Sequence, residues 1–406
     1  MVLDVANLRA HRQPVRLRTI LAVVAASLLV ASACASDSES DPSSDEPVVD
    51  INEIQVLGSH NSYHQQPREE IFTVLEQISA ELAESIEYSH VPLTEQFTDH
   101  GVRQIEIDVF ADPDGGLFAS QAGNAFVGLP AESGIPELDE PGFKVLHTQD
   151  FDYATNCLTL TICLEEVEAW SAANPDHVPL MVMIEAKQES IEEAAEGLGS
   201  DVEIPDLGWA VPLEFTKELF DDLDAEILSV IPEDGIITPD DVRGDHDTLE
   251  EAVLEDGWPT LEDSRGKIMF SLVDGGDQRD TYLEGHRSLE GRVLFTNAEP
   301  GEPDAAFVRV DDPIEDGDRI RELVEAGYLV RTRSDTPTGD ARAGDTTRRE
   351  AALASGAQFV STDYEVPDDM FGTGYVVAIP DGTPARCNPV NAPPDCTPEA
   401  IAEPSG

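Results

Sequence analysis

Basic residues are scarce in this chain, which has 24 Lys and Arg against 83 Asp and Glu among 406 residues. Proteins bind nucleic acid phosphates through clustered Lys and Arg, so this composition excludes nucleic acid as a partner. The same charge repels an anionic membrane, unless 1 M salt shortens the screening length to about 3 Å or a bound cation offsets the field. An acidic surface that keeps a protein soluble in a saline or alkaline habitat explains most of the charge.

Apolar sequence is also limited near the N-terminus. The run from Ile20 to Ala33 has 14 residues and follows four Arg, so it is too short to span a bilayer but suits a signal peptide over residues 1–33. Ala31 and Ala33 fit ordinary cleavage, while the same residues resemble a bacterial lipoprotein signal in which Cys34 is lipidated, with Ala31 where Leu is usual. We therefore expect an exported protein, either extracellular or lipid-anchored to the outer face of the cell membrane. With four Arg and one Asp removed in the leader, 20 basic and 82 acidic residues remain.

Only five cysteines occur, an odd number for an exported protein. Lipidation of Cys34 would leave four, in two pairs that are close in sequence. Proximity alone then predicts the disulfides Cys157–Cys163 and Cys387–Cys396. Four free thiols are the alternative, which an oxidising compartment disfavours.

The sequence has no repeat of solenoid length and no glycine-rich nucleotide loop. Residues 34–48 are small, charged and without apolar periodicity, which predicts a flexible acidic linker. From residue 49 to 380, apolar strand-like runs alternate with stretches whose apolar residues recur every three or four positions, which favours a parallel sheet. Residues 381–406 form a Pro-rich tail around the last cysteine pair. The eight strand-like runs are Ile54–Leu57, Gln104–Val109, Phe143–His147, Leu180–Glu185, Lys267–Val273, Val293–Phe295, Tyr328–Thr332 and Gln358–Ser361.

Eight parallel strands predict an α/β fold, a (β/α)8 TIM barrel in regular or distorted form. Gly101, Gly327 and Gly356 each stand where a helix would end before a strand, a place that favours the left-handed conformation of glycine. The stretch Asp201–Glu262 is rich in Asp, Glu and Pro, and we interpret it as an acidic helix-loop insertion after the fourth strand.

Polar groups close four of these apolar runs, at the strand ends where barrels hold their chemistry. Glu106 and Asp108 share one face of a strand, about 7 Å apart. Buried unpaired anions cost several kcal/mol each, so the pair must protonate, find a basic partner such as Lys187 or a barrel arginine, or bind a cation. Glu185 adds a third carboxylate and Asn61 a neutral oxygen. Such a set suits one Ca²⁺, or a more hydrated Mg²⁺, better than Zn²⁺, which would recruit a histidine.

His60 and His147 then remain free to transfer protons, as a general base and a general acid that break a phosphodiester need. We expect the other histidines of the folded part to lie on the surface. Lys187, Arg331 and Arg333 lie near the same rim, where they would contact phosphate or form salt bridges with neighbouring acids. The surface histidines in this interpretation are His64, His90, His100, His177, His246 and His286.

Together these motifs resemble the catalytic half of the calcium-dependent phosphatidylinositol-specific phospholipase C family, especially its compact, single-domain bacterial branch. The resemblance covers about residues 51–375, which makes residues 49–380 the catalytic domain. It rests on Gly58-Ser59-His60-Asn61-Ser62-Tyr63, on Glu106-x-Asp108 behind Gly101-Val102-Arg103, on His147 and Glu185, and on the later stretches Gly257–Leu261, Arg331–Asp335 and Ser355–Tyr364.

The resemblance implies that Asn61, Glu106, Asp108 and Glu185 hold one Ca²⁺ ion. It implies that His60 binds the phosphate or stabilises its charge, and that His147 protonates the leaving group and later activates water. Attack by the inositol 2-hydroxyl would give a cyclic phosphate and release diacylglycerol. The sequence departs from the larger animal enzymes because it has no recognisable membrane-targeting module.

Two other functions stay open. A glycerophosphodiester phosphodiesterase on a similar barrel would take soluble headgroups and suit the acidic surface, but that family usually has His-Arg where this chain has His60-Asn61. A non-catalytic, calcium-dependent headgroup-binding lipoprotein would need neither histidine. We expect a monomer that meets the membrane surface transiently or through a lipid anchor.

Overall fold

The computed structural model describes residues 47–197 and 207–404. The predicted signal peptide, Cys34 and nearly all of the linker 34–48 lie outside the described residues, as does the start of the acidic insertion. Among the helices that are described, none is long and apolar enough to cross a bilayer. The described residues form one compact unit by their contacts, so the described part of the Pro-rich tail belongs to the same unit as the barrel.

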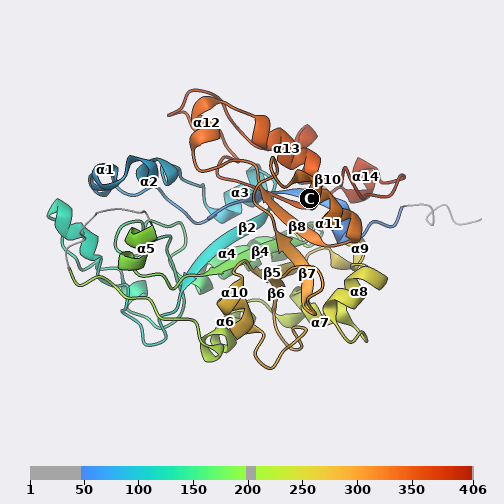
Figure 1. Cartoon of the computed structure of the whole chain (residues 1–406), viewed down its shortest axis with the longest axis horizontal. Coiled ribbons are helices and arrows are strands. Elements are labelled where there is room, and N and C mark those ends of the chain that lie inside the picture. The colour runs from blue at the N-terminus through green and yellow to red at the C-terminus, as the bar shows by residue number, and fades with distance from the viewer. Residues whose placement is uncertain (1–46, 198–206, 405–406) are drawn as a thin grey trace, which may run out of the picture. The chain divides into compact units, whose positions relative to one another are not determined.

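Eight parallel strands of the described chain close into a barrel (Figure 1). Each strand pairs with the next, and β1 pairs with both β2 and β9, which leaves no open edge between first and last strand. The predicted (β/α)8 barrel is therefore confirmed. In chain order the barrel strands are β1 (Ile54–Ser59), β2 (Val102–Phe110), β4 (Leu180–Ala186), β5 (Ile268–Leu272), β6 (Leu294–Asn297), β7 (Ala305–Arg309), β8 (Leu329–Arg333) and β9 (Phe359–Thr362).

One expected barrel strand is wrong. Within the run Phe143–His147, only β3 (Lys144–Val145) is a strand, and it pairs antiparallel with the end of β2, outside the barrel. The barrel reaches eight strands through β7, the sixth barrel strand in chain order, which sequence patterning did not indicate. His147 therefore lies on a loop beside the barrel mouth and not at the end of a barrel strand.

Helices surround the barrel (Figure 1). Gly101, Gly327 and Gly356 have φ values of 67°, 107° and 92°, so the predicted left-handed glycines do stand between helix and strand. The α-helices are α1 (Glu69–Ile78), α2 (Ala80–Ser85), α3 (Leu93–Asp99), α4 (Leu160–Ala173), α5 (Ile191–Gly197), α6 (Lys217–Val230), α7 (Pro239–Arg243), α8 (Leu249–Glu255), α9 (Leu261–Ser264), α10 (Gly276–Tyr282), α11 (Gly317–Ala326), α12 (Gly339–Ala343), α13 (Thr347–Ser355) and α14 (Pro398–Ile401). Short 3-10 helices are η2 (Ile51–Glu53), η3 (Ala122–Val127), η4 (Pro136–Leu138), η5 (Glu233–Gly235) and η6 (Pro380–Gly382).

Where it is described, the acidic insertion contains α6 to α8 and the start of α9, joined by irregular segments such as residues 207–216. It follows β4, the fourth strand in chain order, as expected. Because β3 is not part of the barrel, β4 is the third strand of the barrel itself.

The tail returns to the barrel. Its strand β10 (Ala385–Cys387) pairs antiparallel with β1. A disulfide joins Cys387 to Cys396, and another joins Cys157 to Cys163 just before and within α4.

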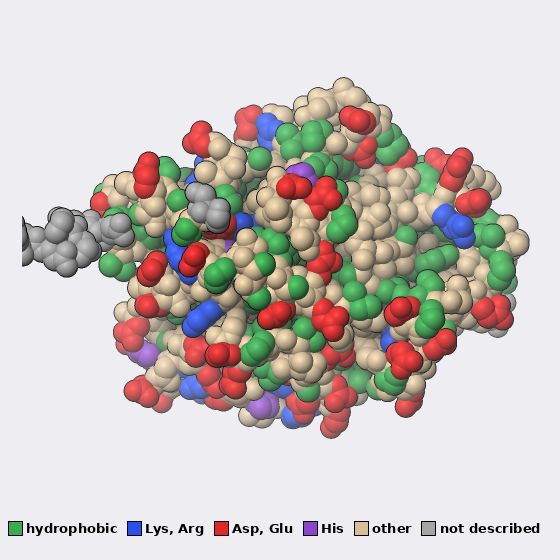
Figure 2. Space-filling view, turned by 180° about the vertical axis from the view of Figure 1, so that it is seen from behind, with side chains coloured by type: hydrophobic (Ala, Val, Ile, Leu, Met, Phe, Trp, Pro, Cys, Tyr) green, Lys and Arg blue, Asp and Glu red, His purple; other side chains and the backbone are tan. Residues whose placement is uncertain are grey.

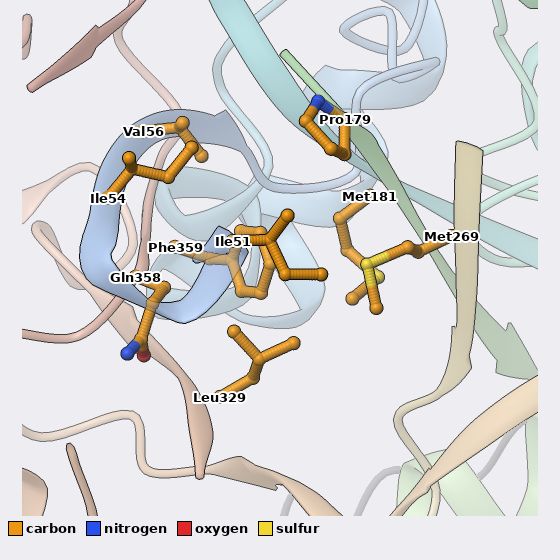
Figure 3. A pocket seen from close by; sticks show the side chains of 9 residues that line it. All are labelled: Ile51, Ile54, Val56, Pro179, Met181, Met269, Leu329, Gln358 and Phe359. Atoms are coloured by element: carbon orange, nitrogen blue, oxygen red, sulfur yellow. The ribbon is translucent and has the colours of Figure 1, made fainter. Parts of the chain in front are cut away.

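Apolar side chains close the amino-terminal end of the barrel (Figure 3). Val56, Met181, Met269, Leu329 and Phe359 come from five different strands or strand ends and surround a cavity of about 20 Å³. This end carries packing and not chemistry. Acidic side chains are spread over the outer surface, as the face in Figure 2 shows.

Candidate functional site

Three carboxylates meet at the carboxyl end of β2 and β4. Glu106 and Asp108 alternate with buried apolar residues along β2, so both point to one side of the strand, and Asp108 pairs in register with Glu185 of β4. One oxygen from each of Glu106, Asp108 and Glu185 lies within 4.8 Å of the others. The convergence expected from the sequence is therefore present.

Buried oxygens in this cluster lack hydrogen bonds. Asp108 is fully buried, and neither of its carboxylate oxygens has a hydrogen-bond partner among the described residues. Asn61 is 2% exposed, and its side-chain oxygen likewise has no hydrogen-bond partner within the described chain. Asn61 also has a φ of 44°, an uncommon conformation for a residue other than glycine. Unpaired, buried oxygens of this kind fit a hard cation with oxygen ligands, such as Ca²⁺.

Lys187 is the basic neighbour of the cluster. Its Nζ lies 3.1 Å from Glu185 Oε1 and 3.4 Å from Asp108 Oδ2. Burial raises the pKa of Asp108 well above its usual value, and the charge of Glu185 raises it further, although Lys187 opposes both. Burial also acts to raise the pKa of Glu185, but Lys187 outweighs it and the net shift is downward. Lys187 and Arg331, whose Nη2 lies 2.6 Å from Glu106 Oε2, together offset only part of the formal negative charge of the three carboxylates.

His60 follows β1 and is held by its Nδ1. That nitrogen lies 2.8 Å from Asp363 Oδ1, just after β9, while Nε2 lies 3.9 Å from Glu106 Oε1. Burial and then the charge of Arg333 lower the pKa of His60. Burial alone would raise the pKa of Asp363, but Arg333 and His60 hold it well below its usual range. Asp363 therefore accepts from Nδ1–H and leaves Nε2 of His60 free, facing the carboxylates.

His147 is held in the same way, on the loop that follows β3. Its Nδ1 lies 2.7 Å from Asp152 Oδ2, and Nε2 of the fully buried His64 lies 2.9 Å from the same oxygen. Burial acts to raise the pKa of Asp152, but the two imidazoles lower it to about 2. Asp152 is thus a carboxylate that accepts two N–H groups, which leaves Nε2 of His147 free. The ring is partly exposed, with 23% of its side-chain surface accessible.

Three histidines that we expected on the surface are buried, and that expectation is wrong for them. His64 bonds Asp152, and His177 bonds Ser171 and the carbonyl of Val178. His90 Nδ1 lies 2.9 Å from Glu365, and its Nε2 lies 2.7 Å from the carbonyl oxygen of His60. His64 and His90 therefore support the two histidines of the site.

The basic residues expected near the phosphate form ion pairs. Arg331 is 2% exposed, donates to Glu106 Oε2 at 2.6 Å and also pairs with Asp311. Arg333 donates to Asp363 Oδ2 at 2.7 Å. Of the two interpretations of these arginines, the geometry of the protein alone agrees with salt bridges, and phosphate contact stays a prediction.

Sequence patterning missed the acids that hold the histidines. Asp152 lies five residues after His147, and Asp363 lies in the stretch Ser355–Tyr364 that carried part of the family resemblance. Their pairing depends on loop geometry and on barrel closure, so no spacing rule indicates it. The assembled site has two imidazoles with free Nε2 atoms beside a carboxylate cluster, which is equipment for acid–base chemistry on a substrate whose charge a cation neutralises.

The chain was compared with known proteins. A family model described as phosphoinositide phospholipase C, Ca²⁺-dependent, matches residues 49–389. No curated protein gives a significant match. Among solved structures, a calcium-dependent phosphoinositol-specific phospholipase C from Pseudomonas sp. is 15% identical with a TM-score of 0.50, covering 83% of this chain and 95% of that chain. A Ca²⁺-dependent phosphatidylinositol-specific phospholipase C from Streptomyces antibioticus is 18% identical with a TM-score of 0.47, covering 81% and 98%.

Proposed function

Because the chain belongs to the Ca²⁺-dependent phosphoinositide phospholipase C family, we propose that this phosphodiesterase cleaves phosphatidylinositol-type lipids to diacylglycerol and an inositol cyclic phosphate. The observation that carries the proposal is the pair of histidines with free Nε2 atoms beside the Glu106–Asp108–Glu185 cluster. A protein that only bound headgroups would need neither proton-transfer group.

The carboxylates and Asn61 are the ligands in this proposal. When bound there, Ca²⁺ supplies positive charge that stabilises the negative charge developing on the phosphate. One oxygen of Glu106 is already engaged, because Arg331 donates a hydrogen bond to its Oε2. Its Oε1 lies 3.9 Å from His60 Nε2 and would be the oxygen that helps to hold the cation.

The histidines carry the protons. The inositol 2-hydroxyl attacks phosphorus and loses its proton to Glu106, while His60, protonated at both ring nitrogens, donates its Nε2–H to a phosphate oxygen. A Ca²⁺ ion held by the carboxylates and Asn61 would favour the loss of that proton by stabilising the negative charge on the oxygen. The bond from phosphorus to the diacylglycerol oxygen breaks, and protonated His147 delivers its Nε2 proton to that oxygen. Deprotonated His147 then activates a water that opens the cyclic phosphate. Asp152 keeps the imidazole of His147 oriented throughout, because its low pKa keeps it anionic.

Export belongs to the same proposal. The Arg-rich leader and Cys34 support either secretion or lipid anchoring on the outer face of the membrane, and two disulfides suit an oxidising compartment. A monomer that reaches its substrate at the membrane surface fits both routes.

The test separates catalysis from metal binding. His147→Ala should abolish cleavage of phosphatidylinositol while the calcium affinity, measured by calorimetry, stays nearly unchanged. Asp108→Ala should lose both. His246→Ala, a change of a partly exposed histidine paired with Asp256, is the matched control and should keep both. Full turnover by His147→Ala would refute the assignment of the acid.

Substrate choice is tested in the same assay. The mature protein is incubated with phosphatidylinositol and with glycerophosphoinositol, each with calcium or with chelator, and the products are analysed for cyclic inositol phosphate. Cleavage of glycerophosphoinositol alone would favour a glycerophosphodiester phosphodiesterase, which the acidic surface suits. Cleavage of neither would favour a headgroup-binding protein.

A further inference from the structure

The backbone that carries His60 and Asn61 makes a tight turn just after β1. Asn61 has a φ of 44°, and its carbonyl oxygen accepts the backbone N–H of His64 at 2.8 Å. A left-handed conformation is unfavourable in a residue other than glycine, so surrounding contacts must hold it. The same turn carries two groups of the site, the ring of His60 and the side-chain oxygen of Asn61.

His90 contacts this turn at both ends. Its backbone N–H donates to the carbonyl oxygen of His64 at 3.0 Å. Its ring Nε2 lies 2.7 Å from the carbonyl oxygen of His60, which belongs to the peptide group that joins His60 to Asn61. Because a peptide group is planar, a hydrogen bond to this carbonyl fixes the backbone on both sides of it, at His60 and at Asn61.

The other ring nitrogen of His90 faces an acid. Nδ1 lies 2.9 Å from each of the two carboxylate oxygens of Glu365, and both side chains are almost fully buried. A carboxylate and a carbonyl oxygen can accept hydrogen bonds but not donate them, whereas a neutral imidazole donates at one nitrogen alone. Both nitrogens of His90 therefore carry a proton, and the ring is an imidazolium paired with Glu365.

The surroundings of His90 agree with a charged ring. Burial alone would lower the pKa of His90, but the carboxylates of Glu365 and Asp363 oppose it, and the net shift is upward. A hydrogen bond from a charged donor is roughly twice as strong as one between neutral groups. The bond to the carbonyl oxygen of His60 therefore gains strength from the charge that Glu365 stabilises.

The end of β9 and the residues just after it hold His60 at three points. The backbone N–H of His60 donates to the carbonyl oxygen of Thr362 at 2.9 Å, and its ring Nδ1 bonds Asp363. Glu365 reaches the carbonyl oxygen of His60 through His90. The third of these contacts also bears on Asn61, because that carbonyl group belongs to the peptide before it.

We propose that His90, held as an imidazolium by Glu365, is a positioning residue that sets the His60–Asn61 peptide and thereby couples calcium binding to the action of His60. The inference rests on the proposed function, because it names a residue that acts through two groups of that site. His90 acts through the backbone and transfers no proton to the substrate.

Two replacements of His90 separate its two donors. The amide nitrogen of Asn stands near the position of Nδ1 and that of Gln near the position of Nε2. His90→Asn therefore retains a donor toward Glu365, whereas His90→Gln retains one toward the carbonyl oxygen of His60. Both remove the positive charge beside Glu365, and both should unfold at a lower temperature than the wild type. A difference between them in calcium binding or turnover then comes from the bond to His60.

His90→Asn should bind calcium about tenfold more weakly by calorimetry, because a hydrogen bond that holds the backbone of Asn61 is lost. At calcium concentrations that saturate each variant, its kcat on phosphatidylinositol should still be about tenfold lower, because His60 is displaced as well. His90→Gln should recover most of both losses.

The matched control is a second buried histidine, away from the site. His177 bonds the hydroxyl of Ser171 and the carbonyl oxygen of Val178. His177→Asn should lower the unfolding temperature, as the changes of His90 do. It should keep the calcium affinity and the kcat of the wild type.

The wild type supplies a readout that needs no variant. In protein with ¹⁵N-labelled histidine, the two ring nitrogens of an imidazolium have similar chemical shifts, whereas those of a neutral ring are far apart. At pH 7.5, His90 should show the charged pattern. His177, whose pKa is lowered by burial, should show the neutral one.

Three results would overturn the proposal: a neutral ring at His90, wild-type calcium affinity and kcat in His90→Asn, or equal losses in His90→Gln and His90→Asn. Weaker calcium binding by the His177→Asn control would also overturn it, because the effect would then follow from general destabilisation. Failure of the proposed function is seen separately, as a wild type that binds calcium but does not cleave phosphatidylinositol. The calcium and ¹⁵N measurements would still decide whether His90 sets this peptide.

Discussion

Replacement of Asp108 by Asn tests whether the carboxylate cluster is built for a cation. Asp108 is fully buried, neither of its oxygens has a hydrogen bond among the described residues, and it shares Lys187, 3.4 Å from its Oδ2, with Glu185; burial raises its pKa well above the usual value. Without a metal, its charge destabilises the fold. The change to Asn removes that charge and keeps the shape, while Lys187 retains Glu185 as its partner at 3.1 Å.

The expected effect of this change on stability differs with and without calcium. In chelator, Asp108→Asn should stabilise the protein by about 1 to 3 kcal/mol, because Asn does not carry the buried charge, whose burial costs at least as much as that of a polar group without partners. Calcium at 100 times its Kd stabilises the wild type by about 2.7 kcal/mol. A domain of the matched length, residues 49–389, has an unfolding entropy of about 0.7 kcal/mol/K, so Tm should rise by about 4 °C. The variant should lose most of that rise.

Thermal unfolding at pH 7.5, with calcium or with chelator, measures both effects. Asp112→Asn is the matched control, because Asp112 is also buried beside a lysine but accepts the backbone N–H of Leu117 at 3.2 Å, whereas neither oxygen of Asp108 has a hydrogen bond among the described residues. That control should unfold at a lower temperature in chelator and keep the full response to calcium. A lower Tm of Asp108→Asn in chelator, together with an undiminished calcium response, would refute the reasoning.

Three further predictions concern the groups around the cluster. Asp152 has a folded-state pKa of about 2, below its ordinary 3.8, so its contribution of about 2 kcal/mol to stability is present above pH 4 and lost as pH falls toward 2. The free energy of unfolding of Asp152→Asn should therefore depend less on pH between 4 and 2. The same variant should lower kcat at least 100-fold, because His147 loses the acid that orients it. Arg331→Met leaves Glu106 without its partner and should cost about 3 to 5 kcal/mol by chemical denaturation, and a normal stability would contradict the buried pair. Cys157→Ser opens a loop of sequence separation 6 and should cost about 2 kcal/mol, whereas unchanged unfolding would show that the disulfide adds nothing.

The barrel was predictable because its strands are buried on both faces and therefore read as apolar runs. Two strands show the limit of that signal. The run at Phe143 is apolar, yet it covers the end of β2 as an antiparallel addition. Strand β7 begins with Ala305 and Ala306, which carry little strand preference, and its burial comes from neighbours in the barrel. Local pattern cannot separate these two cases, because both depend on which neighbour is available.

The carboxylate cluster was predictable for a different reason. Glu106 and Asp108 lie on one strand face by alternation alone, and strand ends of a barrel meet at one rim. The supports of the histidines were not predictable, because His64 and His90 meet acids 88 and 275 residues away in sequence. A histidine seen alone in a sequence has no visible partner, so its burial is hidden until the chain is folded.

The tail that returns to the barrel changes where an expression boundary can be set. Glu403 Oε1 accepts from Arg103 Nε at 2.7 Å and from the backbone of Val178 at 2.9 Å, and so joins the starts of two barrel strands. Arg103 is only 3% exposed. A gene trimmed at residue 389, where the family match stops, would leave this guanidinium buried without a counter-charge, at a cost of about 3 to 5 kcal/mol. Affinity tags and truncations therefore belong after Glu403, even though the recognisable family region is shorter.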